Sequence, residues 1–271
     1  MIFNKRFFSA SGVIVYLLCL CIVGLLFAAD NSKKTDNPNF VPGKDVRVDV
    51  NSKLVGIDYF MVYVPTDYTD KQDWPVIFFY HGMGEQPTTG PFKQITGGKG
   101  FIIIGMGYVP NSEDKMTQGQ YINYLRRERK SVLEVKKHIC EHLRIDQKRL
   151  FIAGASKGGW HTSIMLESSA KAWAGAVILA AGRSPNTRLF TTDVSRMMLR
   201  GKPIYIGAGE KDNNLAAAKK AAAYYEKLGA KVTFEEYKGA GHAFDPTKPK
   251  ELYNWLSANS SVENTQSNKA D

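Results

Sequence analysis

Apolar positions in the middle of the chain form short continuous runs, separated by longer segments with helical spacing. The runs occupy residues 75–80, 101–106, 149–154, 174–181 and 203–208. Strands covered on both faces, as in a parallel sheet flanked by helices, have this pattern. The sequence therefore predicts a central sheet built mainly of parallel strands.

The segments between these runs predict helices. Residues 118–143 and 213–228 repeat their apolar side chains at helical spacing, and the second segment is closed by Gly229. The remaining predicted elements are a partly exposed strand at 54–65, a last strand at 231–237 and a last helix at 249–258. Alternation of strands and helices predicts a single α/β domain, with a mostly parallel central sheet and helices on both faces.

The N-terminal residues 1–29 have the pattern of a targeting segment. Lys5 and Arg6 precede an unbroken apolar run at 13–29, which ends in small residues. This order is typical of a secretory signal peptide, and the run also reaches the roughly 17–25 residues of an uncleaved membrane anchor. Both interpretations predict an extracytoplasmic protein, secreted or periplasmic, and the second adds membrane attachment through residues 13–29.

Polar segments flank the expected folded body. Residues 30–43 are rich in turn formers and predict a linker, whereas 258–271 have few apolar side chains and predict a disordered tail. The catalytic domain is therefore expected at 44–257. Its one cysteine, Cys140, cannot form an internal disulfide, so the core must supply the stability.

The chain carries a net charge of +10, much of it between Arg126 and Arg149. A basic run on a helix usually forms a solvated face. Nucleic-acid binding needs a recognisable module or interleaved aromatic residues, and the sequence has neither. We therefore expect no nucleic-acid partner, and the oligomeric state does not follow from the sequence.

The loop after the apolar run at 149–154 reads "GASKGG" (154–159) and precedes a helical pattern. A serine at a sharp strand-to-helix turn holds its hydroxyl exposed, and flanking side chains would collide with the neighbouring strand and helix. A plain turn of small residues has the same composition. Ser156 is therefore a candidate nucleophile, and the other loops must supply its partners.

A nucleophilic serine needs a base, and the base needs an orienting carboxylate. Asp212 follows the run at 203–208, and His242 follows the strand predicted at 231–237. The chain order Ser, Asp, His is the one the α/β-hydrolase arrangement requires. Glu210 is an alternative acid, and Asp212 could instead cap a helix.

The glycine-rich loop "HGMG" (81–84) follows the run at 75–80 and lets a backbone amide point at a developing negative charge. We expect the amides of Met83 and Lys157 to form an oxyanion hole. A simple strand-terminating turn is the alternative for this loop. The residues expected to contact the substrate are His81, Gly82 and Trp160.

Together, the segments HGMG, GASKGG, GEKD and GHAF resemble those of α/β-hydrolase-fold serine esterases, particularly the dienelactone hydrolase, feruloyl esterase and polyhydroxybutyrate depolymerase-like branch. The resemblance spans about 55–257 and implies the α/β-hydrolase fold. It implies the same roles for Ser156, His242, Asp212, Met83 and Lys157. The chain also resembles the catalytic domain of prolyl-oligopeptidase-type peptidases, but no propeller-sized segment precedes the body here.

Residues 138–142 read "HICEH", the H-x-x-E-H pattern of inverted zinc peptidases. His138 and His142 would be the ligands and Glu141 the general base. On a helical wheel, however, Glu141 lies nearly opposite the apolar stripe, and no later motif supplies an acidic ligand. We therefore expect surface histidines, no metal and no cofactor. His161, one turn beyond GASKGG, is expected to pack rather than react.

The sequence predicts an extracytoplasmic serine hydrolase that cleaves a small-molecule or polymer-linked carboxylic ester through an acyl-enzyme intermediate. A prolyl-oligopeptidase-like peptidase or an acyltransferase would use the same residues, and assays with ester, amide and acyl-acceptor substrates separate these activities. A non-catalytic binding protein with a hydrolase fold is the alternative from another class. It has no need of a nucleophile, a base, an acid and an oxyanion loop together.

Overall fold

The computed structural model describes residues 39–50, 56–110, 116–242 and 250–261. The predicted signal peptide or anchor at 1–29 lies outside these residues, as do residues 30–38 of the predicted linker. Within the described ranges, no helix is both long enough and apolar enough to span a membrane. The described residues from Phe40 to Ser261 form one compact unit.

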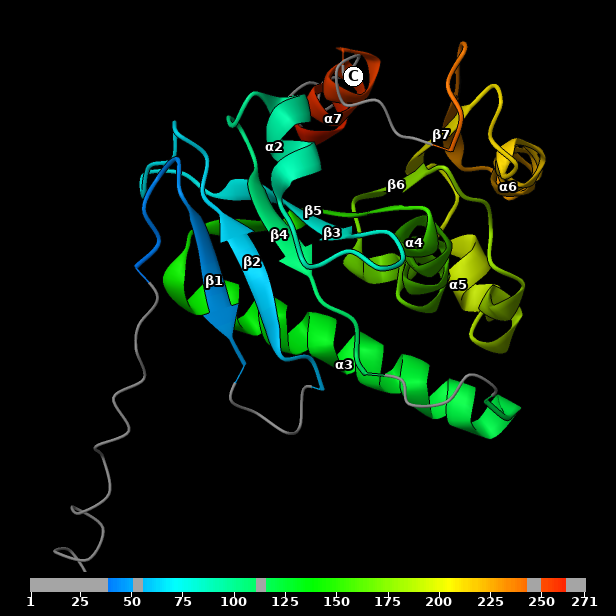
Figure 1. Ribbon diagram of the computed structural model, residues 1–271, viewed down its shortest axis with the longest axis horizontal. Helices are drawn as coiled ribbons and strands as arrows, with labels where there is room; N and C mark the ends of the chain where they lie inside the picture. The colour runs from blue at the N-terminus through cyan, green and yellow to red at the C-terminus, as the bar shows by residue number, and fades with distance from the viewer. Residues whose placement is uncertain (1–38, 51–55, 111–115, 243–249, 262–271) are drawn as a thin grey trace, which may run out of the picture. The chain divides into compact units, whose positions relative to one another are not determined.

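This unit alternates strands and helices, as the apolar pattern predicts (Figure 1). In chain order the strands are β1 (Asp45–Asp49), β2 (Tyr59–Tyr63), β3 (Trp74–Tyr80), β4 (Ile102–Met106), β5 (Ile145–Ala155), β6 (Gly175–Leu179), β7 (Pro203–Gly209) and β8 (Lys231–Tyr237). The described helices are α2 (Gly90–Thr96), α3 (Gln118–His142), α4 (Lys157–Ser168), α5 (Asp193–Met197), α6 (Leu215–Lys227) and α7 (Lys250–Ser260), with 3-10 helices η1 (Ala170–Ala172) and η2 (Pro185–Leu189).

The strands form one eight-stranded sheet in the order β1-β2-β4-β3-β5-β6-β7-β8. β1 and β2 pair antiparallel at one edge, and the six strands from β4 to β8 are parallel. Every residue of β3, β4 and β6 is buried. This burial on both faces explains why the central runs are apolar at nearly every position.

Helices cover both faces of the sheet (Figure 1). The larger core contains the apolar side chains of α3, α4 and α6, and a second core contains those of α2 and α7. Ser156, Asp212 and His242 follow β5, β7 and β8, respectively, at the carboxyl edge of the parallel strands. Ligands of open α/β sheets bind at this edge.

Some element boundaries differ from the sequence predictions for physical reasons. β1 was not predicted, because its sequence DVRVD is short and charged and lies on the exposed edge of the sheet. β5 begins at Ile145 rather than at 149, with polar residues in its exposed first part. α7 runs to Ser260, three residues past the expected domain boundary at 257.

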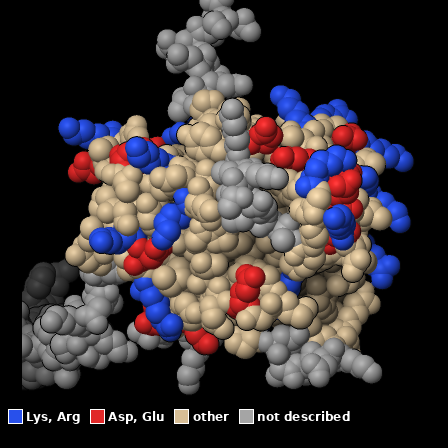
Figure 2. Space-filling view, turned by 45° about the horizontal axis from the view of Figure 1, so that its top comes forward, with Lys and Arg blue, Asp and Glu red and all other residues tan. Residues whose placement is uncertain are grey.

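The basic side chains of α3 lie mostly on its exposed side. Arg126, Arg127, Arg129 and Lys130 are exposed, whereas Glu128 in the same stretch is completely buried. On the face shown in Figure 2, Lys and Arg stand among Asp and Glu. The surface in this view therefore mixes the two signs of charge.

Candidate active site

Ser156 occupies a strained turn between β5 and α4, with φ of 54° and ψ of −119°. A side chain on Gly158 would place its Cβ 2.0 Å from the carbonyl oxygen of Tyr80, and one on Gly154 would place it 2.2 Å from the carbonyl oxygen of Gly158. Only glycine fits either position. The strained turn predicted from GASKGG is present, and strain of this kind costs about 1–3 kcal/mol and clusters at functional sites.

His242 joins Ser156 to Asp212. Its Nε2 lies 2.9 Å from the Ser156 Oγ, and its Nδ1 lies 2.9 Å from Oδ1 of Asp212. An ionised carboxylate can only accept a hydrogen bond, so Nδ1 carries the proton and Nε2 accepts from the serine hydroxyl. In this tautomer the imidazole can take the proton of Ser156, which is what a general base must do.

The carboxylate of Asp212 is positioned by its own loop. Its side chain is completely buried, and Oδ1 also accepts a hydrogen bond from the Asn214 amide at 2.8 Å. Glu210 instead points to solvent and accepts a hydrogen bond from the Gly239 amide. Of the two acids considered from the sequence, Asp212 is therefore the one in contact with His242.

Backbone pairing brings the Asp212 and His242 loops together. The Lys211 amide donates to the carbonyl of Ala240 at 2.8 Å, and the Glu210 amide donates to that of Tyr237 at 3.0 Å. A Cβ on Gly209 would lie 2.2 Å from the carbonyl oxygen of Gly241. Because Gly209 has no side chain, the loop before His242 can pack directly against the end of β7.

The N-terminus of α4 supplies amides beside Ser156. A helix leaves its first N–H groups without intrahelical partners. α4 begins at Lys157, and the Ser156 side chain makes no capping hydrogen bond. In the facing loop, the Gly82 amide donates to Oε2 of Glu85 at 3.0 Å, and the Met83 side chain is 80% exposed. The oxyanion roles of the Met83 and Lys157 amides stay predictions.

Tyr108 links these two parts of the site, and it was not predicted as a site residue. Its hydroxyl donates to the carbonyl of His81 at 2.6 Å, and Nζ of Lys157 lies 4.0 Å from its ring centroid. Burial raises the pKa of Tyr108, which keeps the hydroxyl protonated as a donor. Its position just after β4, at the carboxyl edge of the sheet, is the signal that could have identified it.

A cavity of about 430 Å³ adjoins this part of the site. Aromatic side chains and one lysine contribute to its lining: Tyr108, Tyr121, Tyr124, Trp160 and Lys157. Trp160, expected to contact substrate, therefore lies on a cavity. His81 is only 5% exposed and is not part of this lining, and Gly82 is also buried, so their predicted substrate contacts stay predictions.

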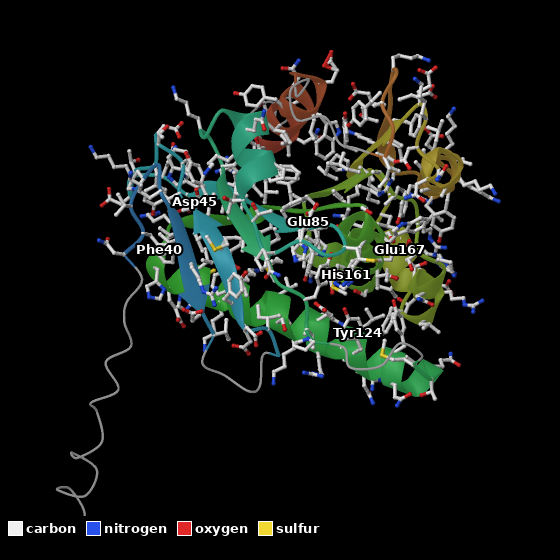
Figure 3. All side chains as sticks on the ribbon, in the orientation of Figure 1. Phe40, Asp45, Glu85, Tyr124, His161 and Glu167 are labelled. Atoms are coloured by element: carbon white, nitrogen blue, oxygen red, sulfur yellow. The ribbon has the colours of Figure 1, made fainter. Side chains whose placement is uncertain are left out.

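His161, on α4, also contributes to the lining of this cavity, although its side chain is mostly buried. Its ring packs 4.6 Å from that of Tyr80, and its Nε2 lies 3.6 Å from Oε2 of the buried Glu128. Figure 3 shows His161 near the centre of the molecule, with Tyr124 on α3. Oε1 of Glu128 accepts from the Val109 amide at 2.8 Å. As expected, His161 packs in the interior.

Solved structures share this fold. A ferulic acid esterase from Anaeromyces mucronatus, in complex with ferulic acid, is 16% identical over 80% of this chain and 90% of its own, with a TM-score of 0.58. An S-formylglutathione hydrolase from Agrobacterium tumefaciens is 14% identical over 80% and 95%, with a TM-score of 0.59. A phospholipase/carboxylesterase from Dyadobacter fermentans is 16% identical over 73% and 95%, with a TM-score of 0.54.

At these identities the likeness shows a shared fold. No match was found among curated proteins. The model of the dienelactone hydrolase family, however, matches residues 60–268, which is most of the chain and extends from the second residue of β2 to beyond the end of α7. The chain belongs to the dienelactone hydrolase family, and it is a carboxylic ester hydrolase with the α/β-hydrolase fold.

Proposed function

We propose that this protein is an extracytoplasmic serine hydrolase that cleaves carboxylic esters through Ser156, His242 and Asp212. His242 takes the proton of Ser156 as Oγ attacks the ester carbonyl, and the acyl group is transferred to the serine. His242 then protonates the departing alkoxide, and water releases the acid in a second attack. Asp212 keeps the imidazole in the tautomer that accepts from Ser156.

The observation that carries this proposal is the position of His242. Its two ring nitrogens each lie 2.9 Å from a partner, one being the hydroxyl of the strained Ser156 and the other the buried carboxylate of Asp212. A buried carboxylate beside an imidazole stabilises the imidazolium that forms during proton transfer. A histidine that served packing alone would not require the serine to adopt a left-handed backbone conformation.

The negative charge that develops on the carbonyl oxygen needs donors placed in advance. The amides of Lys157 and Met83 fill this role in the proposed mechanism, and each donor contributes about 3–4 kcal/mol to the transition state. The apolar run at 13–29 supports an extracytoplasmic location. The substrate is a small-molecule or polymer-linked ester, whose larger group occupies the aromatic cavity beside Trp160.

Trapping the acyl-enzyme tests this proposal. The purified protein is mixed with p-nitrophenyl esters of increasing acyl length, quenched in acid during the first turnovers and digested for mass spectrometry. We expect release of p-nitrophenol and an acyl adduct on the peptide that contains Ser156. Parallel samples with the matching anilides, and with an added alcohol, measure peptidase-like and acyltransferase activity. Ester turnover with the acyl group on another residue would contradict the proposal.

A further inference from the structure

His138, Glu141 and His142 converge on the last turns of α3. One ligand atom from each lies within 4.8 Å of the others. Side chains three and four positions apart share one face of a helix, so this convergence needs no rearrangement of the backbone. We propose that these three residues form a binding site for a divalent transition-metal ion such as Zn²⁺, separate from the hydrolase site.

The environment of His138 supports this proposal. Its side chain is half-buried, and its Nε2 is shielded from solvent and has no hydrogen-bond partner. The Phe60 ring packs edge-on against it, with centroids 5.8 Å apart. A metal ion bound to Nε2 of His138 would give this nitrogen a partner, since it has no hydrogen bond among the described residues.

The hydrogen bond of His142 sets its tautomer. Nδ1 of His142 lies 2.7 Å from the carbonyl oxygen of His138. A carbonyl oxygen only accepts, so Nδ1 carries the proton and the lone pair of the neutral ring is on Nε2. Histidine ligands in metal sites typically donate their other ring nitrogen to a backbone carbonyl or carboxylate in this way. The two imidazole rings lie together, with centroids 4.5 Å apart.

Two further carboxylates, one on α3 and one on the sheet, line a hollow beside His138 and Glu141. This hollow of about 220 Å³ is lined by His138 and Glu141 together with Glu134 of α3 and Asp49 of β1. Asp49 is 61% exposed and pairs with Arg47 at 2.8 Å. A mixed set of imidazole and carboxylate ligands suits Zn²⁺, with Co²⁺ and Ni²⁺ as close substitutes.

The two histidines that the sequence places at the surface lie partly under aromatic side chains. Both rings are half-buried, because Phe60 of β2 covers His138 and Phe40 lies edge-on to His142 at 5.8 Å. In Figure 3, Phe40 lies near one end of α3, and Tyr124 lies toward the other end of the same helix. Tyr124 and His138 are 14 residues apart, so a rise of about 1.5 Å per residue puts them about 21 Å apart along the helix. A metal here would stabilise this end of the fold and take no part in ester hydrolysis.

The test is metal binding by the full-length, metal-free protein, with Zn²⁺ in calorimetry and Co²⁺ as a spectroscopic probe. We expect one strong site per chain, a visible Co²⁺ spectrum that Zn²⁺ abolishes, and a rise in Tm of about 5–10 °C at a Zn²⁺ concentration 100 times Kd. Ester hydrolysis should be the same with and without the metal.

Two variants locate the site. Glu141→Gln changes an exposed side chain and should weaken Zn²⁺ binding at least about tenfold, and His138→Ala should weaken it further. Glu251→Gln, an exposed carboxylate on α7, is the matched control and should bind as the parent protein does. Absence of binding at millimolar Zn²⁺, or binding that survives both Glu141→Gln and His138→Ala, would overturn the proposal. Neither result bears on the role of Ser156.

Discussion

Two clusters of side chains in this protein, one catalytic in the proposed mechanism and one proposed to bind metal, are built in different ways. Ser156, Asp212 and His242 come from three loops, and 86 residues separate the serine from the histidine with which it pairs. His138, Glu141 and His142 come from a little more than one turn of a single helix. The first cluster requires the correct order of β5, β7 and β8 in the sheet, whereas the second requires only helical periodicity.

The backbone conformation also differs between the two clusters. Ser156 has a positive φ, and its neighbours Gly154 and Gly158 touch surrounding backbone so closely that a Cβ would collide. The residues of α3 have ordinary helical geometry. Backbone strain persists only where the surrounding fold enforces it. Ser156 is strained and α3 is not, and this difference distinguishes the proposed catalytic cluster from the proposed metal site.

The largest expected effect is on the nucleophile. Ser156→Ala should lower kcat by about 10⁴–10⁶-fold, because no other group can form the acyl-enzyme. Steady-state hydrolysis of a p-nitrophenyl ester measures this change. Glu141→Gln should leave the same rate unchanged. Equal losses in both variants would erase the distinction between the two clusters.

Substitution of the acid should have the next largest effect. Asp212→Asn should lower kcat by about 10³–10⁴-fold, because an amide no longer favours the tautomer in which Nε2 accepts from Ser156. Glu210→Gln is the matched control on the same loop and should retain nearly full activity, since Glu210 is exposed and does not contact His242. The reverse ranking in kcat would assign the acid to Glu210.

Glycine substitutions test the strain directly. Gly158→Ala should reduce the free energy of unfolding by about 1–3 kcal/mol or more, because its Cβ would lie 2.0 Å from the Tyr80 carbonyl oxygen. Gly119→Ala on α3 meets no atom within 4 Å and should be neutral or stabilising by up to about 1 kcal/mol. Denaturant unfolding of both variants compares them. Equal stabilities would show that the turn at Ser156 is not tightly constrained.

The smallest expected effect concerns Tyr108. Tyr108→Phe removes the hydrogen bond to the His81 carbonyl and keeps the ring that contacts Lys157. A net contribution of about 0.5–1.5 kcal/mol corresponds to a loss of roughly 2–10-fold in kcat with KM nearly unchanged. A change confined to KM would instead indicate that Tyr108 binds substrate through the cavity.

Sequence reasoning predicted the parts of the site that depend on local patterns. An apolar run followed by glycines around Ser156 indicates both the strand and the turn, because the steric requirement lies within a few residues. The choice between Asp212 and Glu210 stayed open, since it depends on backbone pairing between the loops after β7 and β8. Tyr108 was missed because its contact with His81 depends on β4 lying next to β3.

On α3 too, the sequence did not predict contacts with segments that are distant in the chain. Its helical wheel correctly placed Glu141 on the exposed side, but a wheel contains only the residues of its own helix. The rings of Phe40 and Phe60, which cover the two histidines, come from the segment before β1 and from β2. β1, which brings Asp49 to the same hollow, was itself not predicted.

The central claim is that Ser156 is the nucleophile of this hydrolase. A fluorophosphonate probe reacts with serines that are activated by a neighbouring base, and digestion followed by mass spectrometry identifies the labelled residue. We predict a single adduct on Ser156 that disappears in Ser156→Ala, while Glu141→Gln is labelled like the parent protein. Undiminished labelling of the folded Ser156→Ala variant, or no labelling of the folded parent protein, would contradict it.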